Sequence, residues 1–269
     1  MRAFFEAFVK GLGGFSLEVN MKIIRLGGGD RVTNCIVALD EWLIGKDETD
    51  DALIVLPIPT TRDKIRITDT ELTLTELIDL AGPNVKIAGY GIPDHIKDGL
   101  EAKGAKVYDA ALDEVFLVEN ARITAHGALG RILTETGRDL TELSIGIIGY
   151  GRIGSTLYEL LMFLGARVKI YSTSDEKIIR LAMSGAEALG VDKIENFSGL
   201  DILINTAPKK LFSLNEEQRI LSSGTKIIDL ASGRSFASEV VVVMASIPDK
   251  MYPLSAGRLY AKHIVKALF

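Results

Sequence analysis

The chain has 269 residues, enough for two domains that each bury their own core. Its formal net charge is -5, which argues against a nucleic-acid partner because no basic excess exists to neutralise phosphates. Cys35 is the only cysteine, so disulfides within the chain and cysteine-based metal sites are excluded. A lone thiol is typical of a reducing compartment, and we interpret Cys35 as a small buried hydrophobic group.

The first twenty residues carry an apolar stripe at helical spacing that includes Phe4 and Phe8. Glu6 and Lys10 interrupt it, so it lacks the apolar core of a signal peptide, and we treat residues 1–20 as an N-terminal extension. No stretch approaches the ~20 apolar residues of a membrane span. We therefore expect a cytoplasmic protein without a membrane partner.

From residue 21 onward, short apolar runs alternate with amphipathic stretches, the pattern of a parallel sheet covered by helices. This predicts an α/β fold of two doubly wound parallel-sheet domains, the first over residues 21–120. The turn at Gly27–Asp30 lacks the third glycine of a nucleotide loop, and we interpret it as a packing or substrate-side loop. In this domain we expect strands at 22–26, 52–57, 85–88, 106–108 and 115–117, and helices at 73–80 and 93–103.

A helical pattern over Asn120–Thr136 predicts a helix that links the domains, within residues 121–138. The second domain, residues 139–252, is expected to be a Rossmann NAD(P)-binding domain. The final helix, within residues 253–269, is expected to return to the first domain. In the second domain we expect strands at 145–148, 167–171, 201–205, 226–230 and 240–244.

The strand at 145–148 is followed at once by a G-x-G-x-x-G turn and a helix. In that setting the motif is a strong sign of dinucleotide binding. Gly149 permits the tight turn, Gly151 lets the backbone approach the pyrophosphate, and Gly154 lets helix and strand pack closely. The helix N-terminus offers N–H groups to the phosphates. The predicted cofactor-binding residues of the motif are Gly149, Gly151, Arg152, Ile153 and Gly154.

The end of the second strand of this domain bears on the choice of cofactor. NAD sites usually place a carboxylate there to bind the ribose 2′-hydroxyl, whereas this chain has Ser172, Thr173 and Ser174. Small hydroxyls tolerate a 2′-phosphate, and Lys177 or Arg152 could neutralise it, so we expect NADP. The alternative is that Asp175 reaches back and the site accepts NAD.

Two further strand ends are expected to bind the nicotinamide half of the cofactor, because ligands of open α/β sheets lie at the carboxyl ends of the strands. They are the segments Asn205–Pro208 and Leu230–Arg234. The cofactor-binding residues predicted in them are Thr206, Ala207, Pro208 and Ala231.

Several segments together resemble the family of the A subunit of dipicolinate synthase from spore-forming bacteria, from about Met21 to the C-terminus. The opening strand with Gly27 and Gly28 is one of them. The others are Leu56–Thr61, Asn120–Gly127, Ile204–Pro208, Asp229–Ser232 and Ser255–Gly257.

The resemblance implies a fold like that of D-2-hydroxy-acid dehydrogenases, with the active site in a cleft between two domains. It also implies NADP-linked oxidation of dihydrodipicolinate beside a flavoprotein-like second subunit. The chain departs from the family at His126, where the family has Glu, and at Ser232–Phe236, where the family has a Ser-Arg-Pro-Gly-Gly turn. The fold therefore carries over better than the substrate.

A substrate with two carboxylates needs charge-complementary donors. Arg62 and Arg234, with Lys209, are the candidate cations, and Thr60, Thr61, Ser232 and Ser255 could add hydroxyl donors. His126 is the candidate general base, since imidazole titrates near neutrality. We interpret His95 and His263 as surface or packing residues. No cluster of His, Asp and Glu suggests a metal.

Two other functions stay open. A D-2-hydroxy-acid dehydrogenase needs a carboxylate-backed histidine, and the stretch 245–255 where it should fall contains none. A non-catalytic NADP(H)-binding partner protein would agree with the altered cleft. In either case we expect a homo-oligomer.

Overall fold

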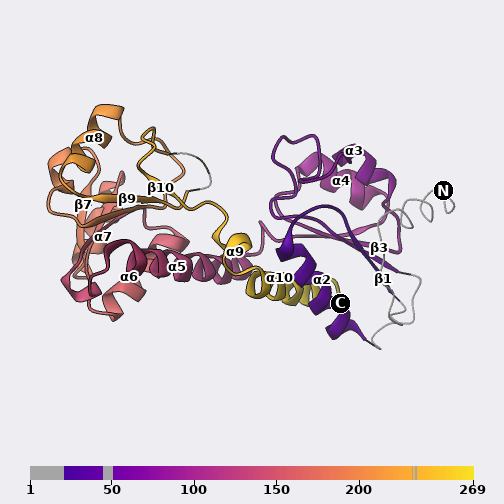
Figure 1. Ribbon diagram of the computed structural model, residues 1–269. Coiled ribbons are helices and arrows are strands. Elements are labelled where there is room, and N and C mark those ends of the chain that lie inside the picture. The colour runs from indigo at the N-terminus through magenta and orange to yellow at the C-terminus, as the bar shows by residue number, and fades with distance from the viewer. Residues whose placement is uncertain (1–20, 45–50, 232, 234) are drawn as a thin grey trace. The chain divides into compact units, whose positions relative to one another are not determined.

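The computed structural model describes residues 21–44, 51–231, 233 and 235–269. The expected N-terminal extension, residues 1–20, lies outside the described residues. The chain divides into two compact units, of which one runs to Glu119 and resumes over Tyr252–Phe269 and the other is Asn120–Met251. Each unit contains its own parallel sheet with helices (Figure 1), which confirms the predicted α/β class.

The first unit is built on a four-stranded sheet in the order β1-β2-β3-β4, and all neighbouring strands are parallel. Its short apolar strands are buried because helices cover both faces. Helices α2 and α10 pack on each other and share a core with one face, and α3 and α4 share a core with the other (Figure 1). The strands are β1 (Lys22–Arg25), β2 (Ala52–Val55), β3 (Val85–Gly89) and β4 (Lys106–Asp109). The helices are α2 (Asp30–Leu43), α3 (Leu74–Asp79), α4 (Asp94–Ala102) and α10 (Pro253–Leu268).

The second unit has a six-stranded parallel sheet in the order β10-β9-β8-β5-β6-β7. The chain runs outward from β5 through β6 to β7 and then returns to β8 on the other side of β5. Such a reversal opens a crevice at the carboxyl ends of the strands, where α/β proteins bind ligands. The strands are β5 (Ser144–Ile148), β6 (Arg167–Ser172), β7 (Glu187–Gly190), β8 (Ile202–Asn205), β9 (Lys226–Asp229) and β10 (Val242–Val243). The helical segments are α6 (Arg152–Phe163), α7 (Asp175–Met183), α8 (Leu214–Ser222), α9 (Ile247–Lys250), η1 (Leu140–Glu142) and η2 (Ile194–Phe197).

Helix α5 (Glu114–Thr136) begins earlier than the sequence predicts and shows that the strand expected at residues 115–117 is wrong. The run Val115–Val118 has the composition of a strand. However, Asp113 Oδ1 accepts hydrogen bonds from the backbone N–H of Val115 at 3.0 Å and of Phe116 at 3.1 Å. These bonds satisfy N–H groups that the first turn of a helix leaves unpaired, so the helix begins there.

Strand β7 was not predicted, because Glu187–Gly190 lacks a continuous apolar run. It lies at the edge of the sheet, and only three of its residues are half-buried. An edge strand pairs on one side only, so its sequence is less constrained than that of a central strand.

A buried histidine anchors α10 in the first unit. The His263 side chain is 1% exposed, with Nδ1 2.6 Å from Asp113 Oδ2 and Nε2 2.8 Å from Glu119 Oε2. Lys262 Nζ also binds Glu119, at 2.9 Å. Each ring nitrogen of this imidazole contacts a carboxylate oxygen. His263 is therefore a packing residue that ties the C-terminal helix to the start of α5.

Candidate dinucleotide-binding site

The turn between β5 and α6 has the geometry that the glycine motif predicts. Gly149 adopts a φ of +93°, a backbone conformation that favours glycine, and its N–H donates to Tyr171 O at 2.9 Å. Helix α6 begins at Arg152 with Gly151 as its N-cap, and no side chain caps it. The N-terminus of α6 therefore follows the strand end directly, as phosphate-binding helices do.

The three motif glycines meet different surroundings. A Cβ atom on Gly154 would lie 2.2 Å from Gly149 O, so α6 approaches the turn more closely than any side chain permits. A Cβ atom on Gly151 would meet nothing within 4 Å. Space is thus open beside the helix N-terminus where a pyrophosphate would be bound. These residues fit a dinucleotide.

Of the three hydroxyl side chains at the end of β6, two accept hydrogen bonds from the backbone and one is exposed. Ser172 is 8% exposed, and its Oγ accepts a hydrogen bond from Ser174 N at 3.1 Å. Ser174 Oγ accepts from Lys177 N and caps α7. Thr173 between them is exposed, as are Asp175 and Lys177. Ser172 and Ser174 therefore shape the strand end, while Thr173 presents its side chain to solvent.

The loop after β8 is tied to the glycine turn. Thr206 Oγ1 donates to Ile148 O at 2.9 Å, and a Cβ atom on Gly149 would lie 2.7 Å from the same hydroxyl. Of the other residues predicted here, Ala207 is half-buried and Pro208 exposed. Thr206 thus holds two strand-end loops together by its hydroxyl.

A buried pair of polar side chains joins this loop to the next, and sequence reasoning did not single it out. Asn205 and Asp229 end β8 and β9 opposite each other, and they are 1% and 0% exposed. Asn205 Nδ2 donates to Asp229 Oδ1 at 2.8 Å. The signal in the sequence was a polar residue that ends each of two otherwise apolar strands.

The predicted residues after β9 are only partly described. Ala231 is 4% exposed, and its N–H donates to Asp229 Oδ1 at 3.1 Å. Ser232 and Arg234 lie outside the described residues. Farther along, the buried Glu217 carboxylate accepts hydrogen bonds from the N–H groups of Ala237 and Ser238, each at 2.9 Å in its shorter contact. The Asp229 carboxylate therefore binds the chain at Ala231, and the Glu217 carboxylate binds it again at Ala237 and Ser238.

In the first unit, the loop after β2 carries Thr60, Thr61 and Arg62. The buried Thr60 Oγ1 accepts a hydrogen bond from Tyr90 N at 2.8 Å. Thr61 Oγ1 accepts from Lys64 N at 2.9 Å. The Arg62 side chain is 68% exposed, and its one contact with the residues that the structure describes is a long ion pair with Asp69, at 3.9 Å. The hydroxyls thus shape the loop, and Arg62 is the residue of the three that is available to an anion.

The glycine turn after β1 is held by a side chain from the strand before it. Arg25 Nε donates to Gly27 O at 2.9 Å, and its Nη2 contacts Gly28 O. A Cβ atom on Gly27 would lie 2.3 Å from Thr68 O. The turn is therefore closely packed, and its interpretation as a packing or substrate-side loop stays a prediction as far as the substrate is concerned.

The remaining candidates lie on exposed positions. His126 is exposed on α5, and Lys209 and Ser255 are exposed as well. Within the described ranges no group of three or more His, Cys, Asp or Glu residues could hold a metal ion. No described helix is both long enough and apolar enough to cross a membrane.

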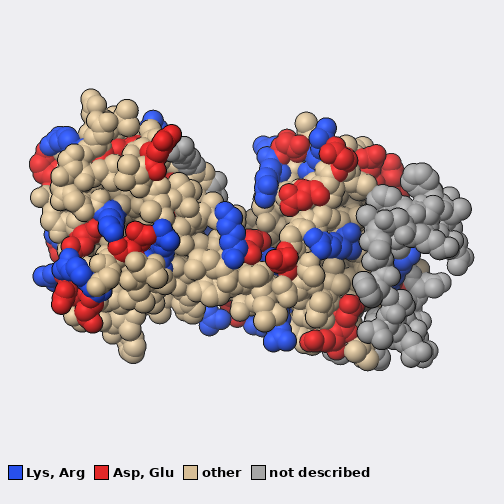
Figure 2. Space-filling model, viewed as in Figure 1, with Lys and Arg blue, Asp and Glu red and all other residues tan. Residues whose placement is uncertain are grey.

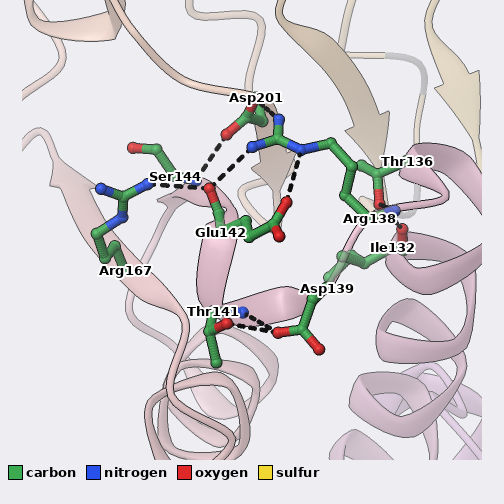
Figure 3. A network of polar contacts seen from close by, with 9 residues as sticks. All are labelled: Ile132, Thr136, Arg138, Asp139, Thr141, Glu142, Ser144, Arg167 and Asp201. Atoms are coloured by element: carbon green, nitrogen blue, oxygen red, sulfur yellow. Dashed lines mark hydrogen bonds and ion pairs between the residues drawn. The ribbon is translucent and has the colours of Figure 1, made fainter.

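The opposite, amino edge of the second sheet carries a polar network (Figure 3). Arg138 Nη1 lies 2.6 Å from Asp201 Oδ1, and Asp201 Oδ2 accepts from Ser144 N at 2.8 Å. Burial opposes ionisation of Asp201, but the hydrogen bonds from Ser144 and Arg138 outweigh it and lower the pKa of this carboxyl. The network borders a groove of about 600 Å³ lined by three cations, of which Arg138 and Lys169 pair with acids and Arg167 donates to Glu142 O at 2.9 Å. On the face that Figure 2 shows, Lys and Arg are interspersed with Asp and Glu among the described residues of each unit.

Comparison with known proteins shows which class of domain the second unit resembles. Residues 118–227 match the family model for the NAD binding domain of D-isomer specific 2-hydroxyacid dehydrogenases. The match includes the glycine turn, α6 and the strands β5 to β8. The unit is thus similar to a nicotinamide-dinucleotide-binding domain of the dehydrogenase type.

A particular relative confirms the resemblance noted from the sequence. The chain is 28% identical over 163 residues to the A subunit of dipicolinate synthase of Bacillus subtilis (strain 168). The alignment covers 56% of this chain and 54% of the relative, so it spans about half the length of that protein.

Solved structures share the fold over nearly the whole chain. The A subunit of dipicolinate synthase from Bacillus halodurans aligns with a TM-score of 0.71 at 20% identity, covering 93% of this chain and 98% of that one. Its Bacillus subtilis counterpart gives 0.70 at 21% identity, covering 93% and 96%. A transhydrogenase from Sinorhizobium meliloti gives 0.57 at 16% identity, covering 91% of each chain. At these identities the likeness concerns the fold.

Proposed function

We propose that this protein is an NADP-dependent oxidoreductase that oxidises dihydrodipicolinate, a cyclic dicarboxylic acid, to dipicolinate. The observation that carries the proposal is the glycine turn between β5 and α6, with its open space at Gly151, in a chain similar to the A subunit of dipicolinate synthase. When bound, the nicotinamide accepts a hydride from the ring, and the ring loses one proton as it becomes aromatic.

The preference for NADP rests on the end of β6. The pyrophosphate would be bound by the backbone of the turn and by the N-terminus of α6 near Gly151, Arg152 and Ile153. The exposed Thr173 would donate to the 2′-phosphate, and no carboxylate precedes Asp175 to repel it. A phosphate with two negative charges gains from such donors, whereas a ribose hydroxyl gains from an acceptor.

The substrate would be bound through its two carboxylates. We propose Arg62 and Arg234 for this role, because a guanidinium binds a carboxylate through two parallel hydrogen bonds. Thr60 and Thr61 support the Arg62 loop with their hydroxyls. Ser232 would add a donor beside Arg234.

His126 is the proposed acceptor of the ring proton. It is exposed on α5, so a proton that it takes can pass directly to water. Aromatisation itself favours loss of the proton, so the acceptor need not be a strong base.

Substrate turnover tests the proposal. Dihydrodipicolinate and NADP are mixed with the enzyme, and NADPH is followed by its absorbance. Calorimetry with dipicolinate in the presence of NADP then compares wild type with Arg62→Ala and Arg234→Ala, each expected to weaken binding roughly ten- to a hundredfold. Arg66→Ala is the matched control, since Arg66 is an exposed arginine of the same loop that pairs with Glu71. Turnover without any effect of either substitution would refute the pocket assignment.

A second function, a non-catalytic NADP(H)-binding partner protein, is favoured by one observation, the departure from the family at His126 and Ser232–Phe236. Cofactor binding without turnover would support it. We further propose a homo-oligomer that works beside a flavoprotein-like second subunit, because the relative is itself one subunit of a larger enzyme by its name. Light scattering of the protein, alone and with the candidate partner, tests this.

A further inference from the structure

We infer that Asp229, together with Asn205, is a positioning residue that makes the loops after β8 and β9 behave as one unit at the nicotinamide end of the site. The inference rests on the proposed function, since it assigns these loops to the cofactor. Neither side chain reaches solvent, so neither can bind a ligand itself.

The Asp229 carboxylate closes its own loop. Its Oδ1 accepts a hydrogen bond from Ala231 N at 3.1 Å, and its Oδ2 accepts from Ser235 N at 3.0 Å. These two N–H groups lie two and six residues along the chain. One carboxylate therefore fixes the beginning and the end of the segment that contains Gly233.

The Asn205 amide closes the other loop and joins it to the first. Its Oδ1 accepts from Ala207 N at 3.1 Å, while its Nδ2 donates to Ala207 O at 3.0 Å and to Asp229 Oδ1 at 2.8 Å. Ser235 Oγ adds a direct link to Ala207 O, at 3.3 Å. Each side-chain N and O atom of Asn205 and Asp229 makes a hydrogen bond. A displacement of one loop therefore disturbs the hydrogen bonds that hold the other.

The glycine turn has a support of its own. Thr206 follows Asn205 and binds Ile148 O, next to Gly149, with its own hydroxyl. Among the described residues, the hydrogen bonds of the Asn205 and Asp229 side chains do not include the glycine turn, so a change in this pair acts on the two nicotinamide-side loops and leaves the pyrophosphate turn in place. Buried polar networks of this kind hold a single arrangement, because any unpaired member is costly.

The test is Asp229→Asn, which replaces one acceptor oxygen by a donor while keeping the shape. The Asp229 carboxylate accepts hydrogen bonds from Ala231 N, Ser235 N and Asn205 Nδ2. An amide has a single acceptor oxygen, so its NH₂ group would face at least one of these three donors. The matched control is Asp201→Asn, at the amino edge of the same sheet. That carboxylate also accepts one backbone N–H and one side-chain donor.

The first readout is binding of two ligands, NADPH and its fragment 2′-phospho-ADP-ribose, which lacks the nicotinamide. We expect Asp229→Asn to weaken NADPH about tenfold and to leave the fragment within twofold of wild type. Asp201→Asn should affect the two ligands equally. An equal loss of both ligands in Asp229→Asn would mean a merely structural role and would overturn the inference.

The second readout needs no ligand and separates this inference from the proposed cofactor. Amide hydrogen exchange of Ala207 and Ser235 should both become faster in Asp229→Asn and stay unchanged in Asp201→Asn. If wild type binds neither ligand, the proposed function fails, and exchange alone decides the coupling. Faster exchange at Ser235 without any change at Ala207 would contradict it. If Asp229→Asn does not fold, Asn205→Ala replaces it, with faster exchange expected at the same two amides.

Discussion

A Cβ atom on Gly154 would lie 2.2 Å from the carbonyl oxygen of Gly149, so the first turn of α6 rests directly on the glycine turn. The obstacle is backbone, which cannot rotate away as a flexible side chain can. We expect Gly154→Ala to lower the free energy of unfolding by about 1–3 kcal/mol, as overpacking does. Urea unfolding of the cofactor-free protein measures this. A variant as stable as wild type would show that α6 can move outward at no cost.

Gly151→Val should change the free energy of unfolding little and abolish cofactor binding. A Cβ atom there meets nothing within 4 Å, and the residue has a φ of -94°, which any side chain adopts. Loss of the glycine N-cap should cost less than about 1 kcal/mol. The side chain would fill the space proposed for the pyrophosphate, so cofactor fluorescence should no longer respond. Retained binding would place the dinucleotide elsewhere on the protein.

Thr173→Asp should reverse the cofactor preference. A carboxylate at the end of β6 would repel a 2′-phosphate and accept a hydrogen bond from a ribose hydroxyl. We expect NADPH to bind roughly ten- to a hundredfold more weakly and NADH to bind more tightly. Thr173→Asn has the same shape without the charge and serves as the control. If both variants bind NADPH alike, the charge at this position does not govern the choice.

The cluster around His263 predicts how stability depends on pH. Burial opposes ionisation of Asp113, but the hydrogen bonds from Phe116 N, His263 and Tyr108 outweigh it and lower the pKa to about 2. Hydrogen bonds from His263 and Lys262 lower the pKa of Glu119 as well. Because both carboxyls titrate below their unfolded values, this stabilisation is complete above about pH 4–5 and is lost as the pH falls towards 2.

We therefore expect His263→Gln to lower the free energy of unfolding by about 2–3 kcal/mol at pH 7. The difference from wild type should shrink as the pH is lowered from 5 to 2. Urea unfolding at several pH values measures both effects, and Lys262→Gln, which removes the more exposed neighbour, is the control. A difference that stays constant down to pH 2 would argue against an ionic contact at His263.

Cys35 should be inert. It is fully buried in the core beside α10, and burial raises the pKa of its thiol well above the ordinary value. Because the thiolate is the reactive form, we expect no reaction with an aromatic disulfide reagent in the folded protein and complete reaction in urea. Rapid labelling of the native protein would mean that the helices α2 and α10 separate readily.

The sequence predicted those features that depend on local pattern. The four strands of the first unit and the glycine turn at Gly149–Gly154 follow from apolar runs and glycine spacing. The strand predicted at residues 115–117 was wrong. The composition there is that of a strand, but the Asp113 side chain caps the first turn of α5, so the chain is helical. The sequence could not reveal that Asn205 meets Asp229, because residues 24 apart become neighbours only through strand register. Nor could it show that the hydroxyl of Thr60 is used by Tyr90 N.

The central claim is that the turn between β5 and α6 binds NADP(H), and fluorescence titration of the wild-type protein with NADPH and NADH tests it most directly. The account predicts saturable binding of both cofactors, with NADPH bound at least tenfold more tightly. Equal affinity or a preference for NADH would contradict the assignment of Thr173 to the 2′-phosphate. No binding of either cofactor would contradict the claim itself.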